Sequence, residues 1–195
     1  YNRYAPKLDA IAYYNSVNTI LNKKFVDERV YGEDTRAFLF RNQEGASLQV
    51  LYKDKGRIDT FIPLPGVGEV EVIWIDGTRT TLDAGGEGIT LTLSNDPVSI
   101  TYQGGPEKLP AELGEPAISL ASAPQALVRT EKAVVEVTVN RGSAEQVTMA
   151  AQPLWTVEKA VDGNIVRFTL SAPEQTNARE LDTAITIANA AGRPA

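Results

Sequence analysis

The chain has 195 residues, 43% of them hydrophobic and 23% charged, which are ordinary proportions for a globular protein. Its 19 basic and 25 acidic residues give a net charge of −6, which argues against nucleic acid or an anionic membrane surface as a partner. Because the sequence lacks cysteine and histidine, disulfides, thiolate nucleophiles, Ser–His dyads and His/Cys zinc sites are excluded. No apolar run approaches the ~20 residues of a membrane span, so no membrane-spanning segment is expected.

The first predicted element is a helix over residues 6–21. Pro6 suits the first turn of a helix, and no further proline or glycine occurs before Gly32. At ~100° per residue, apolar side chains fall on nearly every side of this helix, which leaves little polar surface. We therefore expect two different partners to cover it.

Short strand patterns follow the helix at a spacing of about 8–12 residues, which is typical of a β-sandwich. The predicted strands span residues 26–31, 36–41, 47–52, 58–62, 70–75, 79–82, 89–93 and 98–102. Asp76-Gly77 is the strongest hairpin signal, and the turn sequence at 53–56 also predicts a hairpin.

Residues 104–116 contain three glycines and three prolines without alternation, which predicts a linker. The following strand patterns predict an immunoglobulin-like sandwich, with strands at 117–121, 125–129, 134–139, 146–151, 155–159, 165–170 and 183–188. This pattern stops abruptly at Ala195, so a truncated module is one expectation.

The predicted fold is all-β, with two antiparallel β-sandwich domains in tandem and one N-terminal α-helix packed on the first. The first domain, with the helix, covers residues 1–103 and the linker 104–116. The second domain covers 117–195.

Several segments of the first half resemble, in this order, the C-terminal region of bacterial (β/α)8-barrel glycoside hydrolases. In that family the last barrel helix leads directly into a small β-sandwich packed against the barrel. The segments are PKLDAIAYY at 6–14, RAFLFR at 36–41, LQVLY at 48–52, VIWIDG at 72–77 and ITLTLSNDPVSI at 89–100. The second half resembles only the broad class of immunoglobulin-like modules appended to such enzymes.

This resemblance implies that the catalytic carboxylates lie on barrel strands upstream of Tyr1. It therefore assigns no catalytic, cofactor-binding or metal-binding residue to this chain. It also implies an upstream catalytic barrel of the same parent protein as partner, and an extracellular or cell-surface location in a bacterium.

The carboxylates of the chain itself favour structural roles. Glu69 and Glu71 alternate on one strand face. Paired carboxylates ~5–5.5 Å or ~6.5–9.5 Å apart can hydrolyse glycosides, but a solvated strand face is the preferred interpretation. Asp54, Asp76 and Asp96 lie in turns, where aspartate bonds its own backbone. No Asp-x-Asp-x-Asp-Gly loop supports calcium.

Three aromatic residues are candidate contacts for carbohydrate or a partner: Trp74, Tyr102 and Trp155. Each also has a structural interpretation, namely core packing for both tryptophans and interdomain packing for Tyr102. No set of three aromatic residues is expected to form a platform.

A second candidate surface is the side of the helix that faces the missing barrel. Its residues are Tyr4, Tyr13, Tyr14, Val17 and Leu21. Burial of Leu8, Ile11, Tyr14, Val17 and Leu21 within one isolated chain would contradict this expectation.

The favoured function is a non-catalytic accessory region of a secreted glycoside-hydrolase-like protein, which covers the flank of the barrel and spaces or presents the enzyme. Two alternatives remain. One is a carbohydrate-binding module with a polysaccharide as partner, and the other is a structural or adhesion array at the cell surface.

Overall fold

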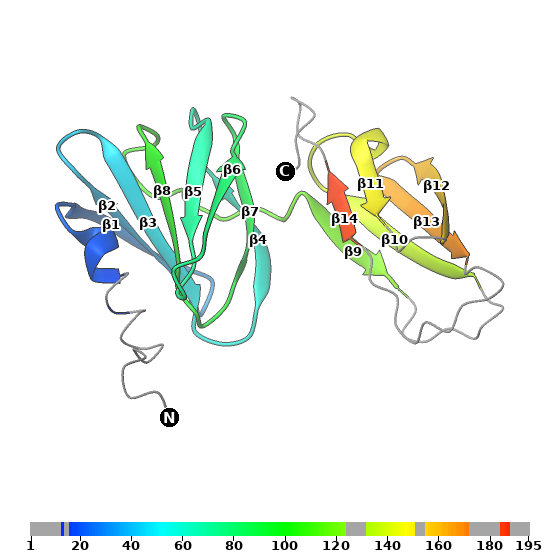
Figure 1. Cartoon of the computed structure of the whole chain (residues 1–195), viewed down its shortest axis with the longest axis horizontal. Coiled ribbons are helices and arrows are strands. Elements are labelled where there is room, and N and C mark those ends of the chain that lie inside the picture. Colours follow the sequence, from blue (N-terminus) through cyan, green and yellow to red (C-terminus); the bar gives the residue numbers. More distant parts are fainter. Residues whose placement is uncertain (1–12, 14–15, 124–131, 151–154, 172–183, 188–195) are drawn as a thin grey trace. The chain divides into compact units, whose positions relative to one another are not determined.

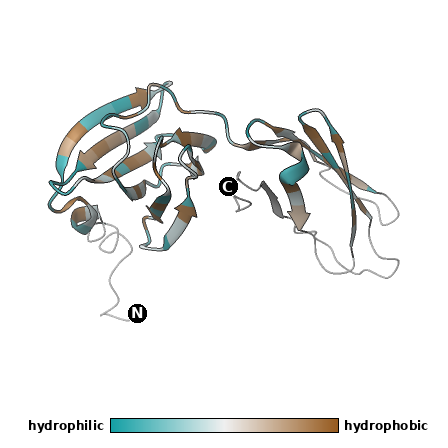
Figure 2. Cartoon of the chain, turned by 90° about the horizontal axis from the view of Figure 1, so that it is seen from above, coloured by the Kyte–Doolittle hydropathy of each residue, from teal (hydrophilic) through white to brown (hydrophobic). Residues whose placement is uncertain are grey.

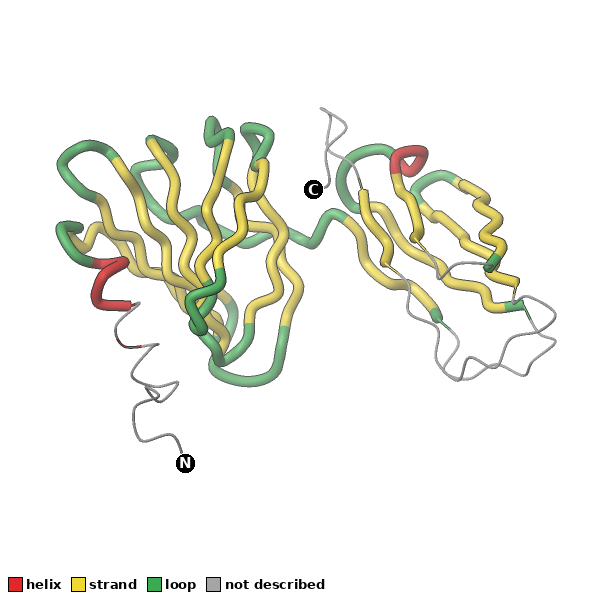
Figure 3. Tube along the Cα trace, in the orientation of Figure 1, coloured by secondary structure: helices red, strands yellow, loops and turns green. Residues whose placement is uncertain are grey.

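The structure is a computed structural model that describes residues 13, 16–123, 132–150, 155–171 and 184–187 (Figure 1). The chain divides into two compact units, Tyr1–Glu115 and Pro116–Ala195, which are described separately below as unit 1 and unit 2. Most of the residues that the structure describes lie in strands (Figure 3). The strand pairings among them are antiparallel. The predicted all-β class is confirmed, while the tandem arrangement of two sandwiches stays a prediction.

Unit 1 contains a six-stranded sheet and a two-stranded sheet. The six-stranded sheet has the order β1 (Lys24–Tyr31), β2 (Thr35–Arg41), β3 (Ala46–Lys53), β8 (Val98–Gln103), β5 (Glu69–Ile73) and β6 (Arg79–Asp83). The two-stranded sheet pairs β4 (Ile58–Pro63) with β7 (Gly88–Leu93).

Buried side chains from both sheets of unit 1 form one core. Leu39, Leu51 and Ile100 from the larger sheet and Ile62 and Leu93 from the smaller one are fully buried in the same cluster. Because side chains alternate along a strand, the residues between them on the larger sheet point to its opposite face. Figure 2 shows that hydrophobic and hydrophilic residues both occur along these strands.

The hairpin predicted at Asp76-Gly77 is confirmed. Gly77 has a φ of 88°, a value that favours glycine, and it connects β5 to β6. The Asp76 carboxylate accepts a hydrogen bond from the Thr78 N–H at 2.8 Å. This bond holds the pKa of Asp76 below its usual value.

The hairpin predicted at residues 53–56 is wrong, because β3 and β4 belong to different sheets. Gly56 still forms the turn, with a φ of 71°. The backbone before it bonds elsewhere: the Lys53 N–H donates to the Ser94 carbonyl, and the Asp54 N–H donates to the Asp34 carbonyl. β7 and β8, which follow each other in the chain, also belong to different sheets.

The N-terminal helix is described at Tyr13 and residues 16–20. It ends where predicted, because the Leu21 N–H still donates to the Val17 carbonyl and Asn22 then adopts a φ of 65°. The rest of the predicted helix, residues 6–12, 14 and 15, lies outside the described residues. Among the helices that the structure describes, none has both the length and the apolar character needed to cross a membrane.

The linker predicted at 104–116 needs a correction, because residues 104–114, hereafter the strap, pack along unit 1. The Arg41 guanidinium donates to the Pro106 carbonyl at 2.6 Å, and Leu109 is only 3% exposed in the core cluster. At the end of the strap, Gly114 forms a β-bridge with Phe61. Buried anchors and paired backbone groups distinguish this segment from a free connection.

Unit 2 contains a four-stranded sheet and a second, two-stranded sheet. The four-stranded sheet has the order β12 (Thr156–Asp162), β13 (Ile165–Ser171), β10 (Ala133–Val139) and β9 (Ile118–Ser122), and the two-stranded sheet pairs β11 (Val147–Ala150) with β14 (Ala184–Ile187). A 3-10 helix, Ala144–Gln146, precedes β11. Phe168, Leu170 and Val166 from β13 lie in its core with Val137 from β10. The strand predicted at 125–129 lies outside the described residues.

Candidate functional site

The most unusual surface of unit 1 is the face of the six-stranded sheet that points away from the core, hereafter the outer face. Residues directly opposite each other in antiparallel strands project to the same side, so the register defines its rows. One row runs Phe25, Phe40, Leu48, Thr101 and Glu71, from β1 through β2, β3 and β8 to β5. This row is therefore apolar from β1 to β3 and polar on β8 and β5.

Four aromatic rings meet on the apolar part of the outer face. Phe25 and Phe40 pack edge to face with ring centroids 5.9 Å apart, and Phe38 stacks on Tyr52 at 6.3 Å. Phe25 is 58% exposed, and the other three rings are half-buried. Only one of the four rings is exposed, so the expectation that no set of three aromatic residues forms a platform stays a prediction.

The N-terminal helix packs on the other part of the outer face. Ile20 and Thr19 line a mostly apolar hollow of about 150 Å³ together with Val50, Ile73 and Trp74. Three residues of the helix and its C-terminal turn point away from this contact and stay exposed: Tyr13 at 73%, Val17 at 43% and Leu21 at 57%. Of the predicted partner-facing residues, Tyr4 and Tyr14 lie outside the described residues.

A second hollow of about 920 Å³, open to solvent and lined by both polar and apolar side chains, lies between the end of the helix and β8, β5 and β6. In it, the Arg79 guanidinium donates to both oxygens of the Glu71 carboxylate, at 3.0 and 3.1 Å. The Thr101 hydroxyl donates to the same carboxylate at 3.4 Å. Glu71 is thus engaged in a cross-strand ion pair on a solvated strand face, as the structural interpretation expects.

The three aromatic candidates from the sequence differ in their surroundings. Trp74 is half-buried, packs against the core of unit 1 and borders the small hollow. Trp155 is half-buried against the core of unit 2. Neither side chain stands free on the surface.

Tyr102 must be dropped as a candidate contact, because it is only 4% exposed. Its hydroxyl accepts a hydrogen bond from the Gln49 amide at 2.6 Å, and burial raises the pKa of the phenol. A ring enclosed in this way offers no face to a sugar or a partner. Its alternation with polar Thr101 and Gln103 was the sequence signal for burial.

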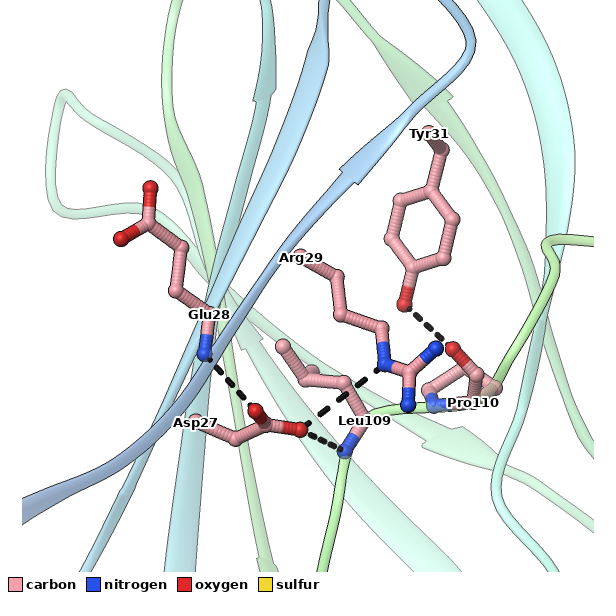
Figure 4. Close-up of polar contacts among 6 residues, drawn as sticks. All are labelled: Asp27, Glu28, Arg29, Tyr31, Leu109 and Pro110. Atoms are coloured by element: carbon pink, nitrogen blue, oxygen red, sulfur yellow. Dashed lines mark hydrogen bonds and ion pairs between the residues drawn. The ribbon is translucent and has the colours of Figure 1, made fainter.

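A third group of polar residues lies where β1 meets the strap (Figure 4). The Tyr31 hydroxyl donates to the Pro110 carbonyl at 2.9 Å, and the Leu109 N–H donates to the Asp27 carboxylate at 3.1 Å. Arg29 Nε lies 3.9 Å from the same carboxylate. Burial raises the pKa of Tyr31 to about 12, so the phenol is protonated at neutral pH and is no base. We interpret this group as a clamp that holds the strap.

No group of three or more Asp and Glu side chains that could hold a metal ion occurs in the described part of the chain. The expectation of a chain without metal, cofactor or catalytic residues stays a prediction. Comparisons of the chain with protein-family models, with curated proteins and with solved structures find no match. The functional interpretation therefore depends on the surfaces described above.

The aromatic rings were missed because they are spread over three strands. Phe38 and Phe40 alternate with buried Ala37 and Leu39, so both phenylalanines had to face away from the core. That alternation was present in the sequence, but the pairing with Phe25 and Tyr52 depends on the register of β1 and β3.

Proposed function

We propose that this chain is the non-catalytic accessory region of a secreted bacterial glycoside-hydrolase-like protein, and that its helix docks on an upstream catalytic barrel. The observation that carries the proposal is the division of the helix into two sides. Ile20 lies against the sheet, while Tyr13, Val17 and Leu21 recur at intervals of four residues on an exposed side. Such spacing aligns side chains in one stripe along a helix.

One of the aromatic rings follows the exposed stripe closely along the chain. Leu21 is followed by Phe25 at the start of β1, and both are more than half exposed. Contiguous exposed apolar side chains mark interaction surfaces, and burying each large one contributes about 1.5–3 kcal/mol. A protein domain of matching shape, such as a barrel flank, suits this surface because it covers the stripe and the rings together.

The carbohydrate-binding alternative keeps one supporting observation, which is the group of aromatic rings on an open sheet. Phe25 in particular presents more than half of its side chain to solvent. Stacking of pyranose rings on this group would place a polysaccharide where the docking proposal places a protein domain.

The direct test is the coding sequence that precedes this chain in its genome. We expect a (β/α)8 barrel with two catalytic carboxylates directly upstream. Further β-sandwich modules upstream would overturn the proposal and favour the adhesion array.

A second test asks whether the chain is catalytic on its own. Incubation with a panel of aryl glycosides should give no turnover above the buffer control. Reproducible turnover that a single carboxylate variant, such as Glu71→Gln, abolishes would contradict the accessory role.

A further inference from the structure

We propose that β6 pairs, edge to edge, with β6 of a second copy of this chain, in an antiparallel register centred on Thr81. Among the strands that the structure describes, β6 pairs with β5 alone and ends the six-stranded sheet. One side of its backbone is therefore open to another strand. This contact is separate from the docking of the helix, because it uses the backbone of β6 and not the exposed stripe of the helix.

The two edges of the six-stranded sheet differ in how they are protected. At the β1 edge, the register shifts between Phe25 and Asp27, and the clamp fastens the strap to the same strand. Bulges and covering segments of this kind commonly prevent an edge from pairing with another chain. In the part of the chain that the structure describes, β6 has neither device. It pairs with β5 without a register shift, contains no proline or glycine, and exposes its first three residues.

The bonds at the two ends of the β5–β6 ladder show which backbone groups of β6 face outward. The Trp74 N–H donates to the Thr78 carbonyl, and the Ala84 N–H donates to the Gly68 carbonyl. Because bonded pairs alternate along an antiparallel ladder, the even-numbered residues from 78 to 84 bond to β5. The odd-numbered residues of β6 therefore turn their N–H and C=O groups toward the edge.

The sequence of β6 is complementary to itself in the register that overlaps its whole length. There Thr81 lies opposite Thr81 of the second copy, and Arg79 lies opposite Asp83. All three are outward-facing residues, so each can exchange both backbone bonds with the residue opposite. Directly opposite side chains project to the same face, so the register also joins an arginine to an aspartate at both ends. Moving the centre to a neighbouring residue separates these charges.

The existing ion pair leaves Arg79 able to make this contact. Its bonds to Glu71 use Nη1, the guanidinium has five N–H donors, and the side chain is 59% exposed. Pairing of a five-residue strand forms an interface much smaller than the ~800 Å² per partner of a stable complex. We therefore expect a weak dimer, with a dissociation constant of about 0.1–1 mM.

The test is sedimentation and amide exchange of the full chain at rising protein concentration. The average mass should rise from 21.1 kDa toward twice that value. The amides of Arg79, Thr81 and Asp83 should exchange more slowly as the dimer forms, whereas those of Thr80 and Leu82 should be protected throughout. A mass that stays at 21.1 kDa at millimolar concentration, or a dimer that leaves the three outward amides unprotected, would overturn the proposal.

Charge reversal tests the register. Arg79→Asp and Asp83→Arg each place like charges opposite each other, so each variant alone should associate at least tenfold more weakly than the unmodified chain. An equimolar mixture of the two variants should associate again, because every opposite pair then joins an arginine to an aspartate. This recovery also shows that both variants are folded. A mixture that stays monomeric while each variant keeps the circular dichroism of the unmodified chain would contradict the register.

Two controls locate the interface. Lys159→Glu reverses an exposed charge on β12, which is an edge strand of the four-stranded sheet in unit 2. Leu21→Ser removes part of the exposed stripe of the helix. Both variants should dimerise as the unmodified chain does. Loss of the dimer in either one would place the contact on unit 2 or on the helix, and would contradict its assignment to β6.

Discussion

At the scale of single residues, the core of unit 1 contains one polar pair whose partners depend on each other. Gln49 is fully buried, its amide donates to the Tyr102 hydroxyl, and its carbonyl oxygen has no partner. Burying a polar group without a hydrogen-bonding partner lowers the stability of the fold, whereas burying a well-packed apolar group does not. The pair thus makes this part of the core sensitive to the loss of either side chain.

The variant Tyr102→Phe should lower the free energy of unfolding by about 1–3 kcal/mol, because it leaves the Gln49 amide buried and unpaired. The double variant Gln49→Leu/Tyr102→Phe should recover part of the loss, since both partners are then apolar. Urea unfolding followed by tryptophan fluorescence measures both. The account would be contradicted if the double variant lost as much free energy of unfolding as Gln49→Leu and Tyr102→Phe lose together when each is made alone.

Tyr31 gives a prediction on pH. Burial raises its folded-state pKa to about 12, whereas an unfolded tyrosine titrates near ~10. The contribution of the neutral phenol to stability is therefore fully present below about pH 10 and is lost as the pH rises through about 12. In an ultraviolet titration of the phenolates, Tyr31→Phe should remove one late-titrating group, while the buried Tyr102, whose pKa is also raised, should still titrate late. A Tyr31 that ionises near pH ~10 in the folded chain would contradict the buried hydrogen bond to Pro110.

At the scale of elements, the strap holds the two sheets of unit 1 together. It begins near β2 and β3, where Arg41 and Ser47 bond to its carbonyls, passes β1 at the clamp, and ends on β4 at Gly114. It thus contacts both the six-stranded and the two-stranded sheet. Its glycines and prolines predicted a linker because local composition does not reveal these distant partners.

Leu109→Ala tests the role of the strap. Leu109 is buried in the core cluster, so its truncation should lower the free energy of unfolding by about 2–5 kcal/mol. Leu21→Ala is the matched control, since Leu21 is more than half exposed, and it should change stability by about 0.5 kcal/mol or less. Equal effects of the two substitutions in urea unfolding would show that the strap is a linker after all.

The sequence predicted local features well and long-range ones poorly. The positions of the strands and the turn at Gly77 follow from alternation and from glycine's access to positive φ, both of which are local. The pairing partner of each strand does not follow from local sequence. For this reason the turn at Gly56 was mistaken for a hairpin. The outer face has the same limit, since its rows of side chains exist only once the strands of the six-stranded sheet are in register.

At the scale of the whole molecule, the central claim is that the exposed stripe of the helix is an interface. Tyr13, Val17 and Leu21 each leave a large part of their side chains exposed. The partner domain should shield them, and it should leave the strap and its clamp unaffected because these lie on other elements.

Hydrogen–deuterium exchange tests this claim most directly, by comparing the isolated chain with the same chain joined to its upstream coding region. In the joined protein, the amides of residues 16–25 should exchange at about one tenth of their rate in the isolated chain, or more slowly still, because docking stabilises the helix against opening. The double variant Val17→Ser/Leu21→Ser should abolish that protection, whereas the clamp variant Tyr31→Phe should keep it. Identical exchange of residues 16–25 in the isolated and joined proteins would contradict the docking role.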